Sequence, residues 1–494
     1  MLISGLALGA VLGFVMQRGR FCVTGFLRDI FTQRSWRGFV ALLIVISVHA
    51  IGLAALTSAG VITPEYKELA PLAVIIGGVI FGLGIVLAGG CASGTWYRSG
   101  EGLIGSWIAL VFYALSAAAM KTGFLNGLQD SLKDRTVGLT SIHASLGISI
   151  WPLVIALSAV TAYFAVRFLR EEFSGPRPAT LAPRKSGLAH ILTEKTWHVY
   201  ATAAIVGVLG VIAWPLSAAT GRNDGLGITT PSSNLANYVV TGDTERFDWG
   251  VLLVLGILVG SFIAAKASGE FRLRVPDATQ GARSVVGGIF MGVGAAWAGG
   301  CTVGNGMVQT SLFSYQGWLA LASIAAGVAI AAKLWLKPSA PSLNDVPSTP
   351  STTNDTAVSA TAPVTSTATS PVSLPGSEGA GAAGTEASPL AGAFTVAPVA
   401  LLDRSVVKQE DGKLTPLGDG RYELDTVGAV CPFPLIEAKD AINKIEVGEE
   451  LVIPFDCTQA TDAIPRWAAK DGHKVTNFEQ TGEAGWTISV RRGR

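Results

Sequence analysis

Long apolar segments separated by short polar connections occupy the first two thirds of the chain. Each segment is close to the roughly 20 residues that an α-helix needs to cross about 30 Å of hydrocarbon. The chain is therefore predicted to be a polytopic α-helical membrane protein embedded in a lipid bilayer. Nine spans are expected, at roughly residues 2–17, 37–58, 71–90, 103–122, 151–169, 196–219, 250–267, 284–300 and 316–336.

The polar pattern changes abruptly after the last span. Residues 338–395 are rich in Ser, Thr, Pro and Ala and have no apolar period, which predicts a disordered linker. Beyond the linker, short alternating runs and helical spacing predict a small two-layer α/β sandwich of the order βαβαββ. Its expected strands and helices are 422–426, 432–445, 451–455, 458–470, 474–479 and 486–490. The expected domains are thus a transmembrane domain at 1–337, the linker at 338–395 and a soluble domain at 396–494.

Composition supports this division and excludes several classes of function. Of the 494 residues, 49% are hydrophobic and only 14% are charged, as expected for a chain that lies mostly in lipid. The net charge is +1 and no basic run is present, so no nucleic-acid partner is expected. The five cysteines are odd in number and lack CxxC spacing. We therefore expect neither a disulfide framework nor a metal site, and no cofactor.

The placement of lysine and arginine predicts the orientation of the spans. If the N-terminus lies outside, these residues fall about three to one on the cytoplasmic side of the expected spans. We therefore expect a multi-pass protein of the bacterial inner (plasma) membrane. Its N-terminus would lie outside and its C-terminal domain in the cytoplasm.

The tetrapeptide Ala-Gly-Gly-Cys occurs twice, at 88–91 and 298–301, each time near the end of a predicted span. In the predicted orientation these two spans run in opposite directions. The nine spans then divide into four, one linker span and four, as an inverted repeat requires. The similar segments at 8–13 and 255–260 conflict with this pairing, and we interpret them as glycine patterns for close helix packing.

Each repeated cysteine follows two glycines, which let the backbone turn sharply. If the segments after Cys91 and Cys301 re-enter the membrane as half-helices, their free N–H groups and partial positive charge face the bilayer interior. Cys91 and Cys301, with Gly90 and Gly300, are therefore candidate contacts for an anion, to which the thiols add polarizable sulfur. The alternative is that Gly-Gly-Cys only permits tight helix crossing, with cysteine as a small apolar filler.

Other ionisable residues lie in or near the spans. Cys22 follows the first span, and Arg20 beside it could activate this thiol or hold an anion at the cytoplasmic exit. The alternative is a buried cysteine beside arginines that only mark the inner side. His49 lies within a span and is a functional candidate, although a hydrogen-bonded neutral histidine explains it as well. Arg98 and Glu101 are expected to form a solvated pair at the membrane surface.

Cys431 carries the strongest local signal and is the catalytic candidate. It immediately precedes Pro432, a favoured first helical residue. A cysteine at a helix N-terminus is stabilised as the thiolate and is therefore nucleophilic. No histidine or acid lies at a fixed spacing to act as a base, which favours sulfur exchange over acyl transfer. Cys457 could be a resolving thiol, a second sulfur acceptor or only a residue at the start of the second helix.

These motifs resemble two known families. Residues 1–336 resemble the YeeE/YedE family of sulfur-compound permeases through the Cys22 segment, AGGCASGTWYRSGEG and AGGCTVGNGMVQTS. Residues from about 421 resemble the TusA-like sulfur carriers through LDxxGxxCPxP at 424–434 and DCTQATDAIP at 456–465. The chain thus resembles a natural fusion of a permease with a carrier.

The resemblance implies uptake of thiosulfate, with Cys22, Cys91 and Cys301 contacting the anion in turn. Cys431 would capture or convert the arriving substrate, and cytoplasmic proteins would accept its sulfur. The linker has an r.m.s. reach on the order of 40 Å, so we expect the carrier to contact the cytoplasmic face of the permease. Typical TusA-like carriers have an acidic residue and a proline where this chain has Cys457 and Thr458. This difference from the family pattern puts in question whether the domain acts as a simple persulfide relay.

Two alternatives remain open at this point. One is a permease for another sulfur or selenium compound. The other is a membrane-anchored sulfurtransferase whose spans serve only as a scaffold. The protein is expected to be primarily a transporter, and the sequence leaves enzymatic activity at Cys431 undecided.

Overall fold

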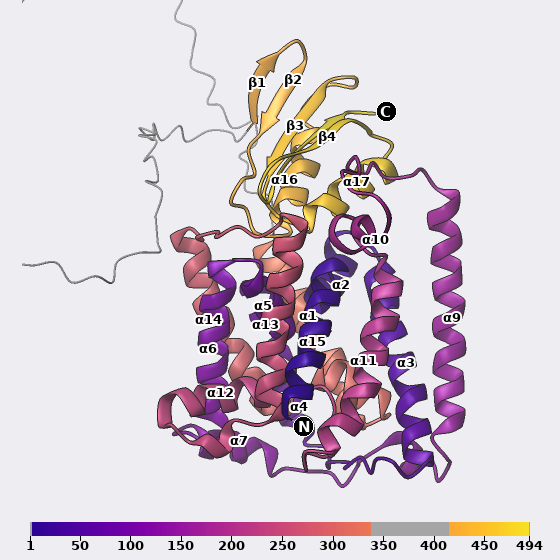
Figure 1. The fold of residues 1–494 in the computed structure, drawn as a ribbon, viewed down its shortest axis with the longest axis vertical. Coiled ribbons are helices and arrows are strands. Elements are labelled where there is room, and N and C mark those ends of the chain that lie inside the picture. The colour runs from indigo at the N-terminus through magenta and orange to yellow at the C-terminus, as the bar shows by residue number, and fades with distance from the viewer. Residues whose placement is uncertain (1, 337–413, 494) are drawn as a thin grey trace, which may run out of the picture. The chain divides into compact units, whose positions relative to one another are not determined.

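Residues 2–336 form a body of helices and residues 414–493 form a small domain built on a sheet, in the computed structural model of the chain (Figure 1). These are the residues that the structure describes. The expected linker at 338–395 lies outside them, as do the first residues of the expected soluble domain, so the three domain boundaries stay predictions. The helices of the first part are α1 (Leu2–Arg18), α2 (Val23–Thr32), α3 (Arg37–Ser58), α4 (Pro71–Leu87), α5 (Ala92–Gly100), α6 (Ile104–Lys121), α7 (Asn126–Lys133), α8 (Ile142–Ser145), α9 (Trp151–Ser174), α10 (Gly187–Ala189), η1 (His190–Glu194), α11 (Val199–Ala218), α12 (Thr229–Thr241), η2 (Thr244–Arg246), α13 (Trp249–Ser268), α14 (Ala278–Ala298), η3 (Gly304–Gln309) and α15 (Tyr315–Trp335).

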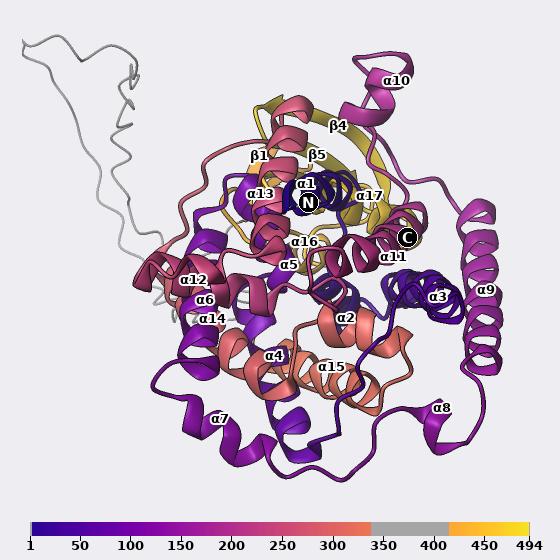
Figure 2. The ribbon, with the colours of Figure 1, turned by 60° about the horizontal axis from the view of Figure 1, so that its bottom comes forward.

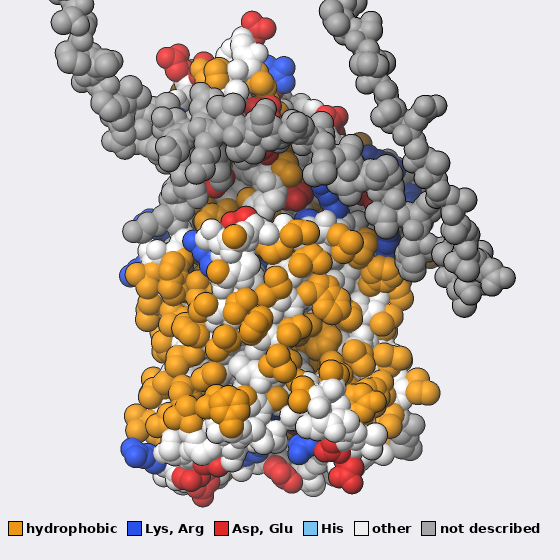
Figure 3. All heavy atoms as spheres, turned by 90° about the vertical axis from the view of Figure 1, so that its left-hand side faces the viewer, with side chains coloured by type: hydrophobic (Ala, Val, Ile, Leu, Met, Phe, Trp, Pro, Cys, Tyr) orange, Lys and Arg blue, Asp and Glu red, His pale blue; other side chains and the backbone are white. Residues whose placement is uncertain are grey.

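Within the described residues, eight helices are long and apolar enough to cross a membrane. The remaining expected span, 284–300, corresponds to α14, which has 21 residues but is not among the eight. Its many glycines and Arg283 lower its mean hydropathy. Figure 3 shows a broad band of hydrophobic side chains on one face of the helical body, bounded by charged side chains at either end. A band of this kind is the surface that lipid covers.

The helices pack in matched pairs, as an inverted repeat requires. The contact between α1 and α13 corresponds in the repeat to the contact between α11 and α3. In the same way, the contact between α6 and α14 corresponds to the contact between α15 and α4. The short α2 contacts α15 as the short α12 contacts α6. Trp197 N donates to Arg18 O at 3.0 Å, so α11 begins beside the end of α1 and the two run in opposite directions. Helix α9 lies at the edge of the body beside α3, the place of a linker span (Figure 2).

Glycines bring the matched helices into backbone contact. A Cβ on Gly9 of α1 would lie 2.1 Å from Leu253 O of α13, and one on Gly256 would lie 2.3 Å from Leu6 O. The two similar glycine segments at 8–13 and 255–260 are therefore packing partners, which confirms their interpretation as close-packing patterns. Helices α4 and α14 cross in the same way, because a Cβ on Gly77 or on Gly294 would lie 2.5 Å from a backbone nitrogen of the other helix.

The C-terminal domain confirms the predicted order βαβαββ and adds one strand before it. Strand β2 is parallel to β3, the other neighbours are antiparallel, and the sheet order is β1-β2-β3-β5-β4. The extra strand β1 has the sequence LTPLG, whose proline and glycine are depleted in strands, and this hid it from the apolar pattern. The elements are β1 (Leu414–Gly418), β2 (Arg421–Leu424), α16 (Phe433–Ile442), β3 (Glu450–Phe455), α17 (Ala460–Lys470), β4 (Lys474–Gly482) and β5 (Gly485–Arg491).

Candidate functional site

Three helices of the body are broken, and a cysteine follows each break. In each case the residue two positions before the cysteine has a positive φ, which turns the chain away from the helix axis. Glycine adopts this conformation freely, whereas an arginine does so only under constraint from its surroundings. The cysteine then lies at or near the start of the next short helix: Cys22 before α2, Cys91 before α5 and Cys301 shortly before η3. The turning residues are Arg20 (φ 51°), Gly89 (φ 71°) and Gly299 (φ 76°).

This geometry refines the role expected of the paired glycines. The first glycine of each pair, Gly89 or Gly299, makes the turn. The second, Gly90 or Gly300, has no positive φ and instead lies beside the short helix that follows, where a Cβ would meet atoms at 3.4–3.7 Å. The predicted half-helices are therefore present, with the turn placed one residue earlier than the candidates Gly90 and Gly300.

Cys22 and Cys91 come together inside the helical body although 69 residues separate them in the sequence. Both are buried, and their thiols lie close enough to interact with each other. Gly94 leaves room for them, because a Cβ there would lie 3.3 Å from Cys91 Sγ and 3.7 Å from Cys22 Sγ. The Gly94 N–H donates to Cys91 Sγ at 3.4 Å, so the thiol of Cys91 caps the N-terminus of α5.

Arg98 is the cation beside this pair of thiols, which corrects the expectation of a solvated Arg98–Glu101 pair. Arg98 is 5% exposed and Glu101 is 2% exposed. The Arg98 guanidinium donates to Gly89 O and lies 4.0 Å from Cys22 Sγ. It therefore holds the carbonyl of the turn and places its charge at the thiols. The sequence around Arg98 predicts a residue on the membrane surface. It does not predict the burial of Arg98, because helices far along the chain, such as α13, pack against α5.

Cys301 lies at the inversion-related break, where a neutral side chain takes the place that the Arg98 guanidinium has at the Cys91 break. It is buried, and Asn305 takes over the task of holding the end of the broken helix. The Asn305 amide donates to Ala298 O at 2.8 Å and to Gly300 O at 3.0 Å. The Tyr113 hydroxyl, which donates to Thr229 Oγ1 at 2.9 Å, is within electrostatic reach of both Cys301 and Cys91.

Arg20 has a different role from the one expected. Its guanidinium lies 2.5 Å from Glu270 and 3.8 Å from Glu101, in a buried network that also includes Arg18. Arg20 therefore neutralises the carboxylates of Glu270 and Glu101, and the guanidinium beside the Cys22 thiol is that of Arg98. Burial alone would raise the pKa of Glu270, yet the Arg20 and Arg18 guanidiniums hold that pKa below its ordinary value. Glu101 is less compensated, so burial raises its pKa.

His49 packs as a core residue of α3. It is 1% exposed, and its Nδ1 lies 3.3 Å from Ser311 Oγ. Its ring fills the space beside Gly210, where a Cβ would lie 3.3 Å from His49 Nε2. This environment fits the alternative of a hydrogen-bonded neutral histidine, and no described contact joins it to the three thiols.

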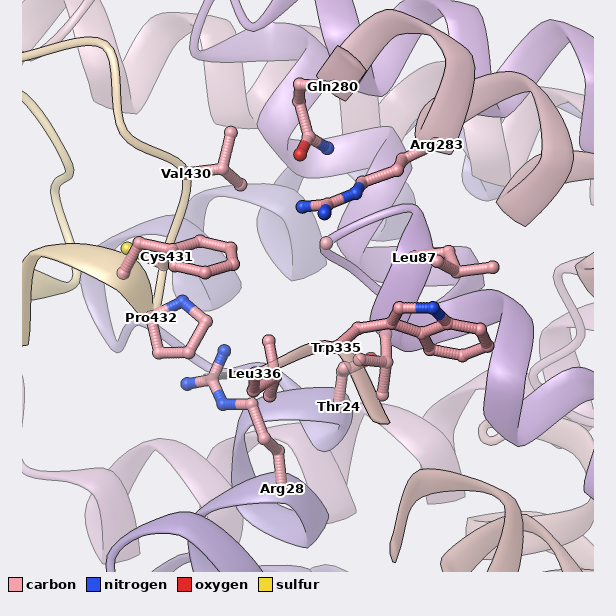
Figure 4. A pocket seen from close by; sticks show the side chains of 13 residues that line it. Thr24, Arg28, Leu87, Gln280, Arg283, Trp335, Leu336, Val430, Cys431 and Pro432 are labelled. Atoms are coloured by element: carbon pink, nitrogen blue, oxygen red, sulfur yellow. The ribbon is translucent and has the colours of Figure 1, made fainter. Parts of the chain in front are cut away.

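The loop that carries Cys431 meets the helical body at the Cys91 break. A Cβ on Gly89 would lie 3.1 Å from the Val430 side chain, so the residue before Cys431 covers the turn itself. Figure 4 shows Cys431 and Pro432 on one side of a small pocket, with Arg28 next to Pro432 and with Gln280 and Arg283 on another side. A second cavity of about 550 Å³ is lined by both Cys22 and Cys431. Arg28 contributes to both spaces, although the sequence suggested for it only a role in orientation.

Cys431 and Cys457 are joined by a disulfide bond, with 6.2 Å between their Cα atoms. The number and spacing of the cysteines predicted no disulfide framework. The structure differs from this prediction by one disulfide bond, between two carrier residues 26 positions apart. The helix after Cys431 begins at Phe433, with Pro432 as its N-cap, so Cys431 lies one residue before the cap. Within the described residues there is no group of three or more His, Cys, Asp or Glu side chains that could hold a metal.

Comparison with known proteins agrees with this architecture. Residues 18–330 match the family described as Sulphur transport, and residues 422–492 match the one described as Sulfurtransferase TusA. The chain belongs to the sulphur transport family. This member of the family is a multi-pass membrane protein that carries a TusA-like sulfur-carrier domain at its C-terminal end, as the motifs predicted.

Its relatives divide between the two parts of the chain. The sulphur transport part is 52% identical over 328 residues to the thiosulfate transporter TsuA of Escherichia coli (strain K12), covering 66% of this chain and 93% of that protein. It is 32% identical over 337 residues to TsuA of Spirochaeta thermophila, covering 65% of this chain and 94% of that protein. The carrier part is 59% identical over 70 residues to TsuB of Escherichia coli, a protein named as a sulfur carrier, covering 14% of this chain and 93% of that protein.

Proposed function

We propose that this protein takes up thiosulfate through a path lined by Cys301, Cys91 and Cys22 and delivers it to Cys431 of the tethered carrier. The observation that carries the proposal is the cavity lined by both Cys22 and Cys431. It places a thiol of the membrane body and the carrier cysteine around one space. The names of the relatives, thiosulfate transporter and sulfur carrier, support the same substrate.

The chemistry of the buried site suits a small sulfur-bearing dianion. Thiols donate weak hydrogen bonds and are polarizable, so they favour soft sulfur over hard oxygen. The guanidinium of Arg98 supplies positive charge at Cys22, and Arg28, which is paired with Asp29, lines a pocket together with Cys431. The N-terminus of α5 adds backbone N–H groups at Cys91.

Uptake of a dianion requires a driving force. Entry into a cell with a negative interior costs about 2.3 kcal/mol per charge per 100 mV, or about 4–5 kcal/mol for two charges. We infer that Cys431 removes arriving thiosulfate by reacting with its outer sulfur, which keeps the local concentration low at the exit. The tether keeps this acceptor close by, which raises its effective concentration.

The proposal places the protein in the bacterial inner membrane, with its N-terminus outside and the carrier in the cytoplasm. The basic residues that set this orientation include Arg28, Arg274 and Arg283, and these lie at the end of the body that meets the carrier. Arg274, for example, donates to Asp456 O of the carrier. Cytoplasmic proteins that accept sulfur are the partners that this arrangement calls for.

Uptake of radiolabelled thiosulfate by vesicles that hold the full-length protein tests the proposal. Hydrogen bonds to charged groups contribute about 1.5–3 kcal/mol, so Cys22→Ala, Cys91→Ala or Cys301→Ala should lower initial uptake about tenfold or more. Ser323→Ala is the matched control, because its buried hydroxyl donates only to Leu319 O in its own helix. Cys431→Ala should leave entry intact and abolish accumulation against an inside-negative potential.

Other outcomes would favour the alternatives. Normal uptake in all three thiol variants would refute the proposal that these thiols line the path. Full accumulation by Cys431→Ala would refute trapping as the driving force. If the wild-type protein cleaves thiosulfate but never transports it, the protein is a membrane-anchored sulfurtransferase. If other sulfur or selenium oxyanions displace the label at lower concentration, thiosulfate is not the preferred substrate.

A further inference from the structure

The carrier domain brings two cysteines together at one edge of its sheet. Cys431 lies at the end of the loop after β2, and Cys457 lies two residues after the end of β3. Because β2 and β3 are parallel neighbours, their carboxyl ends lie at the same edge. Thr426 donates to Pro454 O from its backbone N–H at 3.1 Å and from its hydroxyl at 2.8 Å. The Gly428 N–H donates to Asp456 Oδ1 at 3.0 Å, so hydrogen bonds hold the Cys431 loop to the end of β3 and to the residue before Cys457.

This arrangement fits a cysteine pair that can form and break a bond. The Cα–Cα distance of 6.2 Å lies within the range in which two cysteines can be bridged without moving the backbone. Cys431 is partly buried and faces the cavity that Cys22 also lines, whereas Cys457 is 6% exposed. One thiol is therefore open to a substrate, and the other is reached mainly through the first.

We propose that Cys457 is the resolving thiol of Cys431, so that the carrier domain cleaves thiosulfate reductively and releases sulfide. This inference rests on the proposed function, in which Cys431 takes up the outer sulfur of thiosulfate. In the first step the Cys431 thiolate attacks that sulfur, the S–S bond of thiosulfate breaks, and sulfite leaves with the bonding electron pair. Cys431 then carries a persulfide.

In the second step Cys457 attacks Sγ of Cys431. The bond between Cys431 Sγ and the outer sulfur breaks, and that sulfur leaves with the electron pair and the proton of the Cys457 thiol as hydrogen sulfide ion. The product is the Cys431–Cys457 disulfide. A cytoplasmic dithiol then reduces the disulfide to two thiols and becomes oxidised itself. The sum is thiosulfate plus a dithiol giving sulfite, hydrogen sulfide and the oxidised dithiol.

Resolution is favoured over transfer of the persulfide to Cys457. The structure joins Cys457 Sγ to Cys431 Sγ itself, the atom that a resolving thiol must attack. A persulfide on Cys457 would be buried and out of reach of an acceptor protein, since this residue is only 6% exposed. A resolving thiol, in contrast, needs contact only with Cys431. Disulfides of cytoplasmic proteins are mostly of this transient, catalytic kind.

A single-turnover experiment on the reduced full-length protein in detergent tests the inference. After removal of reductant under anaerobic conditions, thiosulfate is added, and sulfite, sulfide and the mass of the protein are measured. The wild-type protein should release sulfite and sulfide in equal amounts and lose two hydrogens as the disulfide forms. Cys457→Ser should release as much sulfite but at least about tenfold less sulfide, and should keep the mass of one extra sulfur on Cys431.

Further variants make the result unambiguous. Cys457→Ala repeats the measurement without a hydroxyl, and its release of sulfite shows that the domain is folded. Thr476→Ala, on β4, is the matched control and should behave as the wild type. If Cys457→Ser releases sulfide as the wild type does, or the wild type keeps the extra sulfur and forms no disulfide, Cys457 is not the resolving thiol. If the wild type releases no sulfite, Cys431 is not the acceptor, and the proposed function falls together with the inference.

Discussion

The breaks at Cys91 and Cys301 share one backbone design and differ in charge. In both, a glycine of positive φ turns the chain two residues before the cysteine, and a side chain holds the carbonyls that the turn exposes. At Cys91 that side chain is the Arg98 guanidinium, which also faces Cys22. At Cys301 it is the neutral amide of Asn305. The comparison shows that the inverted repeat determines the geometry of both breaks but leaves their chemistry free to diverge.

The divergence gives the proposed path a direction. A dianion leaving the neutral surroundings of Cys301 meets two thiols and a guanidinium at Cys91, and then Arg28 at the carrier. Positive charge is thus met in the second part of the route. Substitutions that separate geometry from charge at the two breaks can test this reading.

The largest effect is expected where the breaks differ most. Arg98→Ala removes the cation beside the thiols and leaves Gly89 O unpaired, so we expect thiosulfate uptake to need about 10–100-fold more substrate for half-saturation. Asn305→Ala removes only neutral hydrogen bonds, each of which contributes about 0.5–1.5 kcal/mol, and should weaken uptake less. The concentration dependence of initial uptake in vesicles measures both. Arg98→Lys keeps the charge and should lie between them, and a stronger effect of Asn305→Ala would refute the asymmetry.

The next effect concerns the shared backbone design. Gly89→Ala and Gly299→Ala each force a Cβ into the left-handed region, at a cost of about 1–2 kcal/mol. Gly299→Ala should be the more destabilising, because its Cβ would lie 2.5 Å from Gln316 Nε2 and would push this group away from Ala298 O and Asn305 Oδ1, whereas Gly89 would meet only the Val430 side chain at 3.1 Å. Thermal unfolding of the purified protein in detergent measures the difference.

The second glycine of each pair provides the control for this prediction. Gly90→Ala and Gly300→Ala meet their neighbours only at 3.6 Å and 3.4 Å and require no positive φ. They should therefore shift the unfolding temperature less than Gly89→Ala and Gly299→Ala. Equal shifts at all four positions would mean that crowding, and not the turn, governs the breaks.

The smallest effect is expected at Tyr113, whose hydroxyl is within electrostatic reach of the cysteines of both breaks. Tyr113→Phe removes the hydrogen bond to Thr229 near both Cys91 and Cys301 and should cost about 0.5–1.5 kcal/mol of stability or binding. We expect uptake to weaken by less than for Arg98→Ala, and the unfolding temperature to fall by less than for Gly299→Ala. Thr229→Val removes the acceptor instead and should reproduce the effect. A loss of uptake in Tyr113→Phe as large as in Arg98→Ala would give Tyr113 a direct role with the substrate.

Much of the fold follows from local patterns in the sequence. Apolar length predicted the spans, the repeated AGGC marked two of the three cysteine-bearing breaks, and apolar alternation with helical spacing predicted the order βαβαββ. These features depend on neighbours within a few residues of one another. The extra strand β1 and the weak hydropathy of α14 escaped because Pro, Gly and a charged residue interrupt their local patterns.

The site itself was only partly predictable. The cysteines were found, but their partners were not, because contact between Cys22 and Cys91 depends on how α1, α2 and α5 pack. Arg20 lies next to Cys22 in sequence and was the natural candidate for its cation. The cation beside Cys22 is Arg98, which reaches it from α5 while Arg20 turns to Glu270. The role of Arg98 appears only once α1, α2 and α5 have been placed relative to one another.

The glycine crossing of α4 and α14 has a consequence for how transport can occur. At Gly77, Gly84, Gly287 and Gly294 a Cβ would lie 2.5–2.8 Å from backbone atoms of the opposite helix, so the two halves of the repeat meet backbone to backbone. Many transporters expose a central site alternately by rocking one repeat against the other. A crossing this close resists such rocking. We therefore expect the anion to advance by local rotation of the thiols and the short helices, while the outer frame that lipid surrounds stays still.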